Sequence, residues 1–218
     1  MQNNTKPSLT TANLFKNKPD LILRTMLKDT RRGWTGPELA TALNISSAWA
    51  ARVLATLEFE RFATRDGKRS QGRVFLSNVD NLKTRWKLSY HITFNRAFSY
   101  RVLTKNPTSL INSMAKKEGF KYAVTGQAAK AIKKGRAPVL PLPVYVDTNN
   151  TPHDIFTLLN KLEDKYDLIP THKNPNLIIL DPHVGEGVFF DASIKDGVWC
   201  VSDLQIELDT NDVRGGVS

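Results

Sequence analysis

Apolar residues recur at helical spacing in three successive segments of the first sixty positions. The first segment, over 20–30, groups its apolar residues on one face and ends at a basic turn. Thr35 and Glu38 have the spacing of a capping box, in which each side chain bonds the backbone N–H of the other, and they open a second helix. Ser46 is a suitable N-cap for a third helix over about 47–60. The pattern predicts three short, consecutive helices.

The third helix separates an apolar side from a small and polar side. Trp49, Val53 and Leu57 follow one another at intervals of four residues, which places them on one face directed at the core. Two helices joined by a tight turn, the second with a small and polar outer face, are typical of a helix-turn-helix, whose second helix enters the major groove of DNA. A plain three-helix bundle is the alternative. The residues expected on the outer face are Ser47, Ala48, Ala51 and Arg52.

Two short strands follow, over 62–65 and 73–76, and the turn between them is flexible and basic. A β-hairpin with a basic tip, directly after a candidate recognition helix, is typical of the wing of a winged helix. We expect its cations to bind DNA phosphates or the minor groove, and the cations just beyond it to extend the same surface. These residues are Arg65, Lys68, Arg69 and Arg73, followed by Lys83 and Arg85.

The rest of the chain alternates between helical and extended patterns, which predicts a mixed α/β domain. Helices are expected over 110–118, about 126–132 and 152–162, with strands over 122–124, 144–146, 177–180, 187–190 and 198–201. The chain is therefore divided into a flexible arm (1–18), a winged-helix domain (19–77), a connector (78–93) and the α/β domain (94–218). Leu82, Trp86 and Tyr90 predict that the connector is an amphipathic helix.

The net charge of +10 is divided unevenly along the chain. Residues 1–140 contain 26 Lys and Arg against 8 Asp and Glu, whereas residues 141–218 contain 5 against 13. A basic first part and an acidic last part favour a polyanionic partner, such as double-stranded DNA, for one end of the chain.

Several classes of protein are excluded by composition. No apolar run approaches the roughly 18 residues that a membrane helix needs, so we expect no membrane partner. The first residues lack an apolar signal core, and the single cysteine, Cys200, excludes an internal disulfide framework, which predicts a cytoplasmic protein. The histidines lack metal-binding spacing, and no nucleophile elbow or phosphate loop occurs, so we expect neither a metal site nor a cofactor.

Three blocks of the second domain carry a resemblance to a known family. They are Tyr122–Ala129, Val144–Val146 and Val198–Leu208. In this order after a winged helix, they resemble the AbiEi-like antitoxin family of type IV toxin–antitoxin and abortive-infection systems. The resemblance implies a repressor of its own operon that binds inverted repeats in the promoter, and a second domain that counters a nucleotidyltransferase-like toxin. Inverted repeats are bound either by two cooperating monomers or by a dimer.

The same resemblance implies that the second domain is a degenerate nucleotidyltransferase fold, which raises an enzymatic alternative. Active members have a Gly-Gly or Gly-Ser turn and, on a following strand, two carboxylates that hold metal ions. Here the turn is Gly126-Gln127 and the strand offers Tyr145 and Asp147, so one carboxylate is missing. We therefore expect a protein that is not an enzyme. A nucleic-acid-binding role in plasmid replication or partition is the other alternative.

Overall fold

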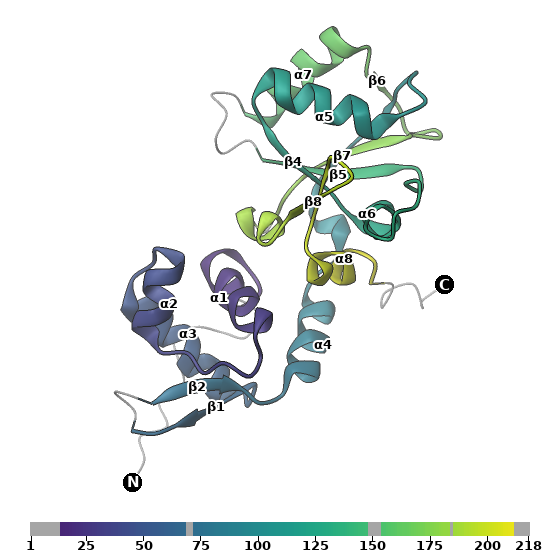
Figure 1. Cartoon of the computed structure of the whole chain (residues 1–218). Coiled ribbons are helices and arrows are strands. Elements are labelled where there is room, and N and C mark those ends of the chain that lie inside the picture. Colours follow the sequence, from purple (N-terminus) through teal and green to yellow (C-terminus); the bar gives the residue numbers. More distant parts are fainter. Residues whose placement is uncertain (1–13, 69–71, 148–153, 184, 212–218) are drawn as a thin grey trace. The chain divides into compact units, whose positions relative to one another are not determined.

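The computed structural model describes residues 14–68, 72–147, 154–183 and 185–211. The chain divides into two compact units, Met1–Tyr90 and His91–Ser218. Within the described residues the protein is a mixed α+β structure with eight α-helices, a two-stranded sheet and a seven-stranded sheet (Figure 1).

The first unit follows the predicted order of helices and strands. Its elements are α1 (Asn17–Lys28), α2 (Gly36–Leu43), α3 (Ser47–Phe59), β1 (Ala63–Asp66), β2 (Arg73–Leu76) and α4 (Val79–Ser89). Both predicted helix starts are confirmed, because Thr35 and Glu38 form the capping box and Ser46 Oγ accepts a hydrogen bond from Trp49 N at 3.2 Å. Asn44 ends α2 in the left-handed conformation, with φ of 51°, which leaves a tight turn before α3.

The hairpin is held by a third, one-residue strand. β1 and β2 pair antiparallel, and Trp34, from the loop between α1 and α2, pairs with Val74 through two backbone hydrogen bonds of 2.9 Å. The ring of Phe75 lies directly on Gly33, where an added Cβ would be 2.4 Å from its Cζ atom. A side chain at position 33 would therefore force this ring to move.

Helix α4 packs within the first unit. Leu82, Trp86 and Tyr90 are buried, and the ring of Trp86 stacks on Phe15 with 5.4 Å between the centroids. Leu14 is also fully buried, so the end of the segment expected as a flexible arm is packed, whereas residues 1–13 lie outside the described residues. The helix predicted for the connector is confirmed, and its apolar side forms part of this core.

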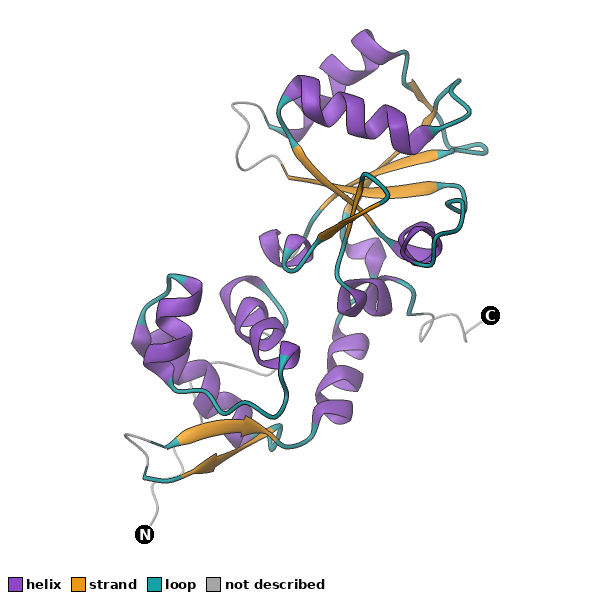
Figure 2. Ribbon diagram, in the orientation of Figure 1, coloured by secondary structure: helices purple, strands orange, loops and turns teal. Residues whose placement is uncertain are grey.

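The second unit contains a mixed sheet in the order β6-β3-β7-β5-β4-β9-β8. The pairs β5–β7 and β4–β9 are parallel and the other neighbours are antiparallel. Helices α5 (Pro107–Glu118) and α7 (Ile155–Tyr166) cover one face, and α6 (Gly126–Lys133) and α8 (Asp203–Asp209) cover the other (Figure 2). The strands are β3 (Arg96–Arg101), β4 (Lys121–Val124), β5 (Leu142–Asp147), β6 (Ile169–Pro170), β7 (Leu177–Asp181), β8 (Ser193–Lys195) and β9 (Val198–Cys200).

One predicted strand is wrong. Residues 187–190 were expected to be extended, but Gly185–Phe189 form the 3₁₀ helix η3. Phe190 N donates to Gly187 O at 3.1 Å, which closes a tight turn in place of a strand ladder. A short apolar run between glycines does not distinguish the two conformations.

The three sequence blocks that carry the family resemblance meet in this unit. β5, β4 and β9 are neighbours in the sheet, and the carboxylate of Asp209, in α8, accepts hydrogen bonds from the hydroxyl groups of Thr125 and Tyr145, the latter at 3.0 Å. Gln205 Nε2 donates to the same carboxylate at 2.9 Å. All four residues are buried, so this network ties α8 to the sheet and to the start of α6.

Candidate nucleic-acid interface

The outer face of α3 is accessible along its length. All four residues predicted for this face, Ser47, Ala48, Ala51 and Arg52, are exposed. On the opposite side Val53, Leu54 and Leu57 are buried in the core, whereas Trp49, predicted for the same apolar face, is only half-buried. The face therefore consists of small side chains and one cation. Such a surface lets another molecule approach the helix backbone closely.

Arg52 is the charged group of this face. Its guanidinium lies over the ring of Trp49, 5.2 Å from the centroid, which is within the range of a cation–π contact. The guanidinium has no hydrogen-bond partner among the described residues. Its five N–H donors are available to a partner outside the chain.

Close packing fixes α3 relative to α2. A Cβ added to Gly36 would lie 3.4 Å from Ser47 O and 3.5 Å from the Cβ of Ala51, so these two residues, although exposed, lie at the edge of the outer face that borders the first turn of α2. The capping box holds the start of α2, with Thr35 N donating to Glu38 Oε2 at 2.9 Å. The outer face of α3 is thus presented by a fixed pair of helices.

Arg65 is bound within the first unit. Its Nε and Nη2 atoms donate to the two carboxylate oxygens of Glu58, at 2.9 and 2.6 Å, and its Nη1 atom donates to Gly72 O at 3.0 Å. Its side chain is only 20% exposed. The contacts join β1 to the last turn of α3 and to the far side of the hairpin. Arg65 therefore positions the hairpin.

Arg73 has a similar structural role. It donates to Gly33 O at 2.7 Å and to Glu38 Oε1 at 2.8 Å, which connects β2 to the capping box. The backbone hydrogen bond from Thr35, followed by the hydrogen bond from Arg73, lowers the pKa of Glu38. Arg73 is nevertheless 49% exposed, so part of its guanidinium remains at the surface.

The other predicted cations differ in accessibility. Lys68 is exposed beside the hairpin turn and has no ion-pair partner among the described residues, whereas Arg69 lies outside them. On α4, Arg85 is exposed and Lys83 is half-buried. Arg32, which was not predicted to be part of this surface, is exposed next to the hairpin, with its guanidinium 3.8 Å from the centroid of Trp34. Only the pairing of Trp34 with β2 brings Arg32 there.

The second unit does not bring together the residues considered for nucleotidyl transfer. Thr125 N donates to Pro143 O, so Gly126 lies at the first end of β5, whereas Asp147 is its last residue. With a rise of about 3.3 Å per residue, these ends are more than 10 Å apart. Tyr145, between them, is fully buried in the network with Asp209.

The other groups of the second unit that could carry chemistry are a cysteine and possible metal ligands. Cys200 is fully buried, and burial raises the pKa of its thiol to about 11. This environment agrees with the prediction that Cys200 is a small apolar core residue. Within the described ranges no group of three His, Cys, Asp or Glu residues has a metal-binding arrangement. None of the described helices combines the length and apolar character needed to cross a bilayer.

Comparisons with models of protein families, with curated proteins and with solved structures gave no match.

Proposed function

We propose that this protein is a sequence-specific, double-stranded DNA-binding transcriptional repressor, and that its first unit is a winged helix. The observation that carries the proposal is the outer face of α3, where the four residues selected from the sequence are all exposed. The order α1, α2, α3, β1, β2, with a tight turn between α2 and α3, supports the helix-turn-helix and wing.

The dimensions of α3 suit the major groove. An α-helix with side chains is about 10–12 Å wide and the groove is about 12 Å wide, so a helix with alanines on its outer face enters deeply. Arg52 is then the group that reads a base, because arginine pairs with the O6 and N7 atoms of guanine. Ser47 lies in the first turn of α3, where recognition helices contact base edges.

The cations divide into two groups in this proposal. Arg65 and Arg73 position the hairpin, since their guanidinium groups bind Glu58 and Glu38. The phosphate contacts are assigned to the remaining wing cations, Lys68 and Arg69, with Arg85 and Lys83 of α4 extending the surface. Electrostatic affinity of this kind weakens as the salt concentration rises.

The family resemblance extends the proposal to the second unit. The three blocks that carry it form neighbouring strands, and each contributes one partner, Thr125, Tyr145 or Gln205, to the buried carboxylate of Asp209, which directly follows the third block. On this basis we propose a cytoplasmic antitoxin that represses its own operon and counters a nucleotidyltransferase-like toxin. Tyr145 occupies the alternate position of β5 where a second carboxylate would accompany Asp147, which argues against an active transferase.

The test is a titration of the full chain with the DNA upstream of its own gene and with a shuffled duplex of equal length, at two salt concentrations. The proposal expects at least tenfold tighter binding to the upstream DNA, at two adjacent sites if inverted repeats are present. Equal and strongly salt-dependent binding to both duplexes would indicate a non-specific basic protein. Absence of binding would contradict the winged-helix interpretation.

A further inference from the structure

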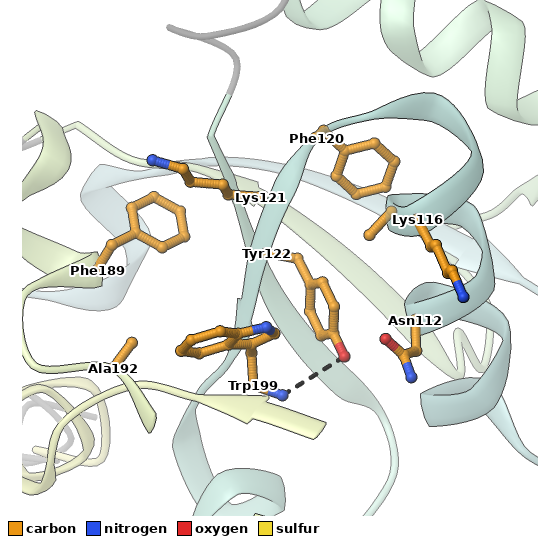
Figure 3. Close-up of a pocket in the computed structure, with 9 residues that line it drawn as sticks. Asn112, Lys116, Phe120, Lys121, Tyr122, Phe189, Ala192 and Trp199 are labelled. Carbon is orange, nitrogen blue, oxygen red and sulfur yellow. Dashed lines mark hydrogen bonds between the residues drawn. The ribbon is translucent and has the colours of Figure 1, made fainter. Parts of the chain in front are cut away.

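The second unit contains a pocket of about 530 Å³ between α5, β4, β9 and the segment from η3 onward (Figure 3). Four aromatic residues line it, namely Phe120, Tyr122, Phe189 and Trp199. None of the nine described residues around it is acidic, and two are lysines. We call this site the aromatic pocket. Its volume and aromatic lining are typical of ligand sites.

Trp199 presents its indole to solvent. The side chain is 41% exposed, although the next two residues, Cys200 and Val201, are buried. Trp199 N donates to Tyr122 Oη at 3.5 Å, which holds β9 beside the tyrosine at the centre of the pocket (Figure 3). Burial raises the pKa of Tyr122, so its hydroxyl stays neutral. An exposed indole with other aromatic rings beside it is a stacking surface for a planar group.

The two lysines lie on opposite sides of the aromatic rings. Lys121 lies beside Phe189, and Lys116 lies beside Asn112 on the other side of Tyr122 (Figure 3). Neither ammonium forms an ion pair with a described residue. The pocket thus offers a positive charge on each side of its aromatic rings, with Lys121 directly opposite Asp147 of β5 in the sheet, and this arrangement favours an aromatic ligand with negative charge.

We propose that the aromatic pocket binds single-stranded nucleic acid, with one base stacked on Trp199 and the adjacent phosphates paired with Lys116 and Lys121. A nucleotide within a strand has a phosphate on each side of its sugar, which matches cations on both sides of the pocket. A free mononucleotide satisfies only one of them. Aromatic rings flanked by cations are the usual elements of sequence-tolerant single-strand sites. This activity is separate from duplex recognition by the first unit.

The experiment measures binding of an oligothymidylate of about 12 nucleotides to the full chain. Trp199 is more exposed than Trp34, Trp49 or Trp86, so stacking is expected to quench tryptophan fluorescence mainly through Trp199. Trp199→Ala is expected to weaken binding by about 5- to 150-fold, whereas Trp199→Phe retains most of the affinity. Leu103→Ala, which removes a 79% exposed apolar residue elsewhere in the unit, is the matched control and binds as the wild type.

The charges are tested separately. Lys116→Ala with Lys121→Ala is expected to flatten the dependence of log K on log salt by about 0.7 per lost phosphate contact. Lys173→Ala, an exposed lysine of the same unit, leaves the slope unchanged. Circular dichroism of each variant shows whether the unit is folded. A wild-type affinity and slope in the folded lysine variant would overturn the assignment of the phosphates.

Two further measurements decide what is bound and where. Thymidine monophosphate that binds as tightly as the oligonucleotide would overturn the strand geometry. A variant with Arg52→Ala and Lys68→Ala, in the first unit, is expected to lose duplex affinity and keep oligonucleotide affinity; loss of both would place the single-strand binding in the first unit. An unchanged affinity of folded Trp199→Ala would also overturn the proposal. If the protein does not recognise duplex DNA but still binds the oligonucleotide through Trp199, only the proposed function is contradicted.

Discussion

Glu58 and Arg65 are joined by a two-point ion pair, with 2.9 Å between Oε1 and Nε and 2.6 Å between Oε2 and Nη2. Glu58 belongs to the last turn of α3 and Arg65 to β1, so the pair fixes the hairpin to the helix that we assign to the major groove. Because a third donor of Arg65 is bound by Gly72 O, this guanidinium is occupied within its own unit.

Arg65→Gln should therefore lower the stability of the first unit but leave the salt dependence of DNA binding nearly unchanged. The pair is mostly buried and three hydrogen bonds of Arg65 are lost, so the change is expected to cost about 1–3 kcal/mol and to lower Tm by several degrees. The slope of log K against log salt for duplex DNA should stay at the wild-type value. Thermal unfolding and the salt titration check the two statements. A slope reduced by about 0.9 would mean that Arg65 contacts a phosphate.

Lys68→Ala should give the opposite result. The side chain is exposed beside the hairpin turn and has no ion pair among the described residues, so its removal should leave Tm unchanged. The salt slope should fall by about 0.9, equally for upstream and shuffled DNA, because a phosphate contact carries no sequence information. Lys173→Ala removes the same charge from the second unit, and an equal change there would attribute the effect to net charge alone.

Arg52→Ala should mainly reduce discrimination. If its guanidinium reads a guanine edge, the difference in binding free energy between upstream and shuffled DNA should shrink by about 1–3 kcal/mol. Binding to shuffled DNA should change little. Competition titrations with both duplexes measure this difference. A uniform loss on both would make Arg52 a phosphate contact.

Tyr145→Phe should destabilise the second unit. The hydroxyl donates to the buried carboxylate of Asp209, which would lose one of its donors, and we expect a cost of about 1–3 kcal/mol. Tyr166→Phe is the matched control. Its hydroxyl bonds Glu118, which keeps its ion pairs with Lys161 and Lys165, so the cost there should be smaller. Urea unfolding measures the free energy of unfolding of both variants. Equal losses would show that the buried network contributes no more to stability than the hydrogen bond between Tyr166 and Glu118.

Asp20 should make the first unit sensitive to pH. Burial raises the pKa of this carboxyl from 3.8 to about 6, although the charge of Arg24 opposes the shift. Because the folded pKa lies above the unfolded value, the protonated form is favoured by folding. The stability contributed by the protonated Asp20 carboxyl is present below about pH 4 and is lost as the pH rises to about 6.

The variant Asp20→Asn isolates this effect, since asparagine is neutral throughout. Its stability relative to the wild type should increase by about 1–3 kcal/mol between pH 4 and pH 7. Denaturant unfolding at the two pH values, followed by tryptophan fluorescence, gives the difference. A constant difference would indicate that Asp20 has the same pKa in the folded and unfolded chains.

The local features of the first unit could be predicted from the sequence because their signals are local. The capping box of Thr35 and Glu38, the N-cap of Ser46 and the periodicity of α3 each depend on residues within one or two turns. The pairing of Arg65 with Glu58 and of Arg73 with Glu38 was not predicted. These partners meet only after the hairpin folds back on the helices, and nothing in their spacing indicates it.

The second unit was predictable in outline only. β5 and β7 lie inside the sheet and have continuous apolar runs, whereas β3 carries Arg96 and Arg101 at its ends and was missed. The aromatic pocket joins α5, β4, β9 and η3, which are separated along the chain. No sequence pattern links Trp199 to Lys116, so the site becomes visible only with the fold.

The pairing of Trp34 with Val74 also determines how the first unit is assembled. The one-residue strand precedes α2, and its partner comes after the hairpin turn, so both α2 and α3 lie inside a loop that this pair closes. Closing this loop costs chain entropy, and the pairing of β1 with β2 is among the contacts that offset it. A ribosome-bound chain that ends before β2 lacks the strand that seals this loop. The contact between Trp34 and Val74 is thus completed only once the hairpin has been synthesised.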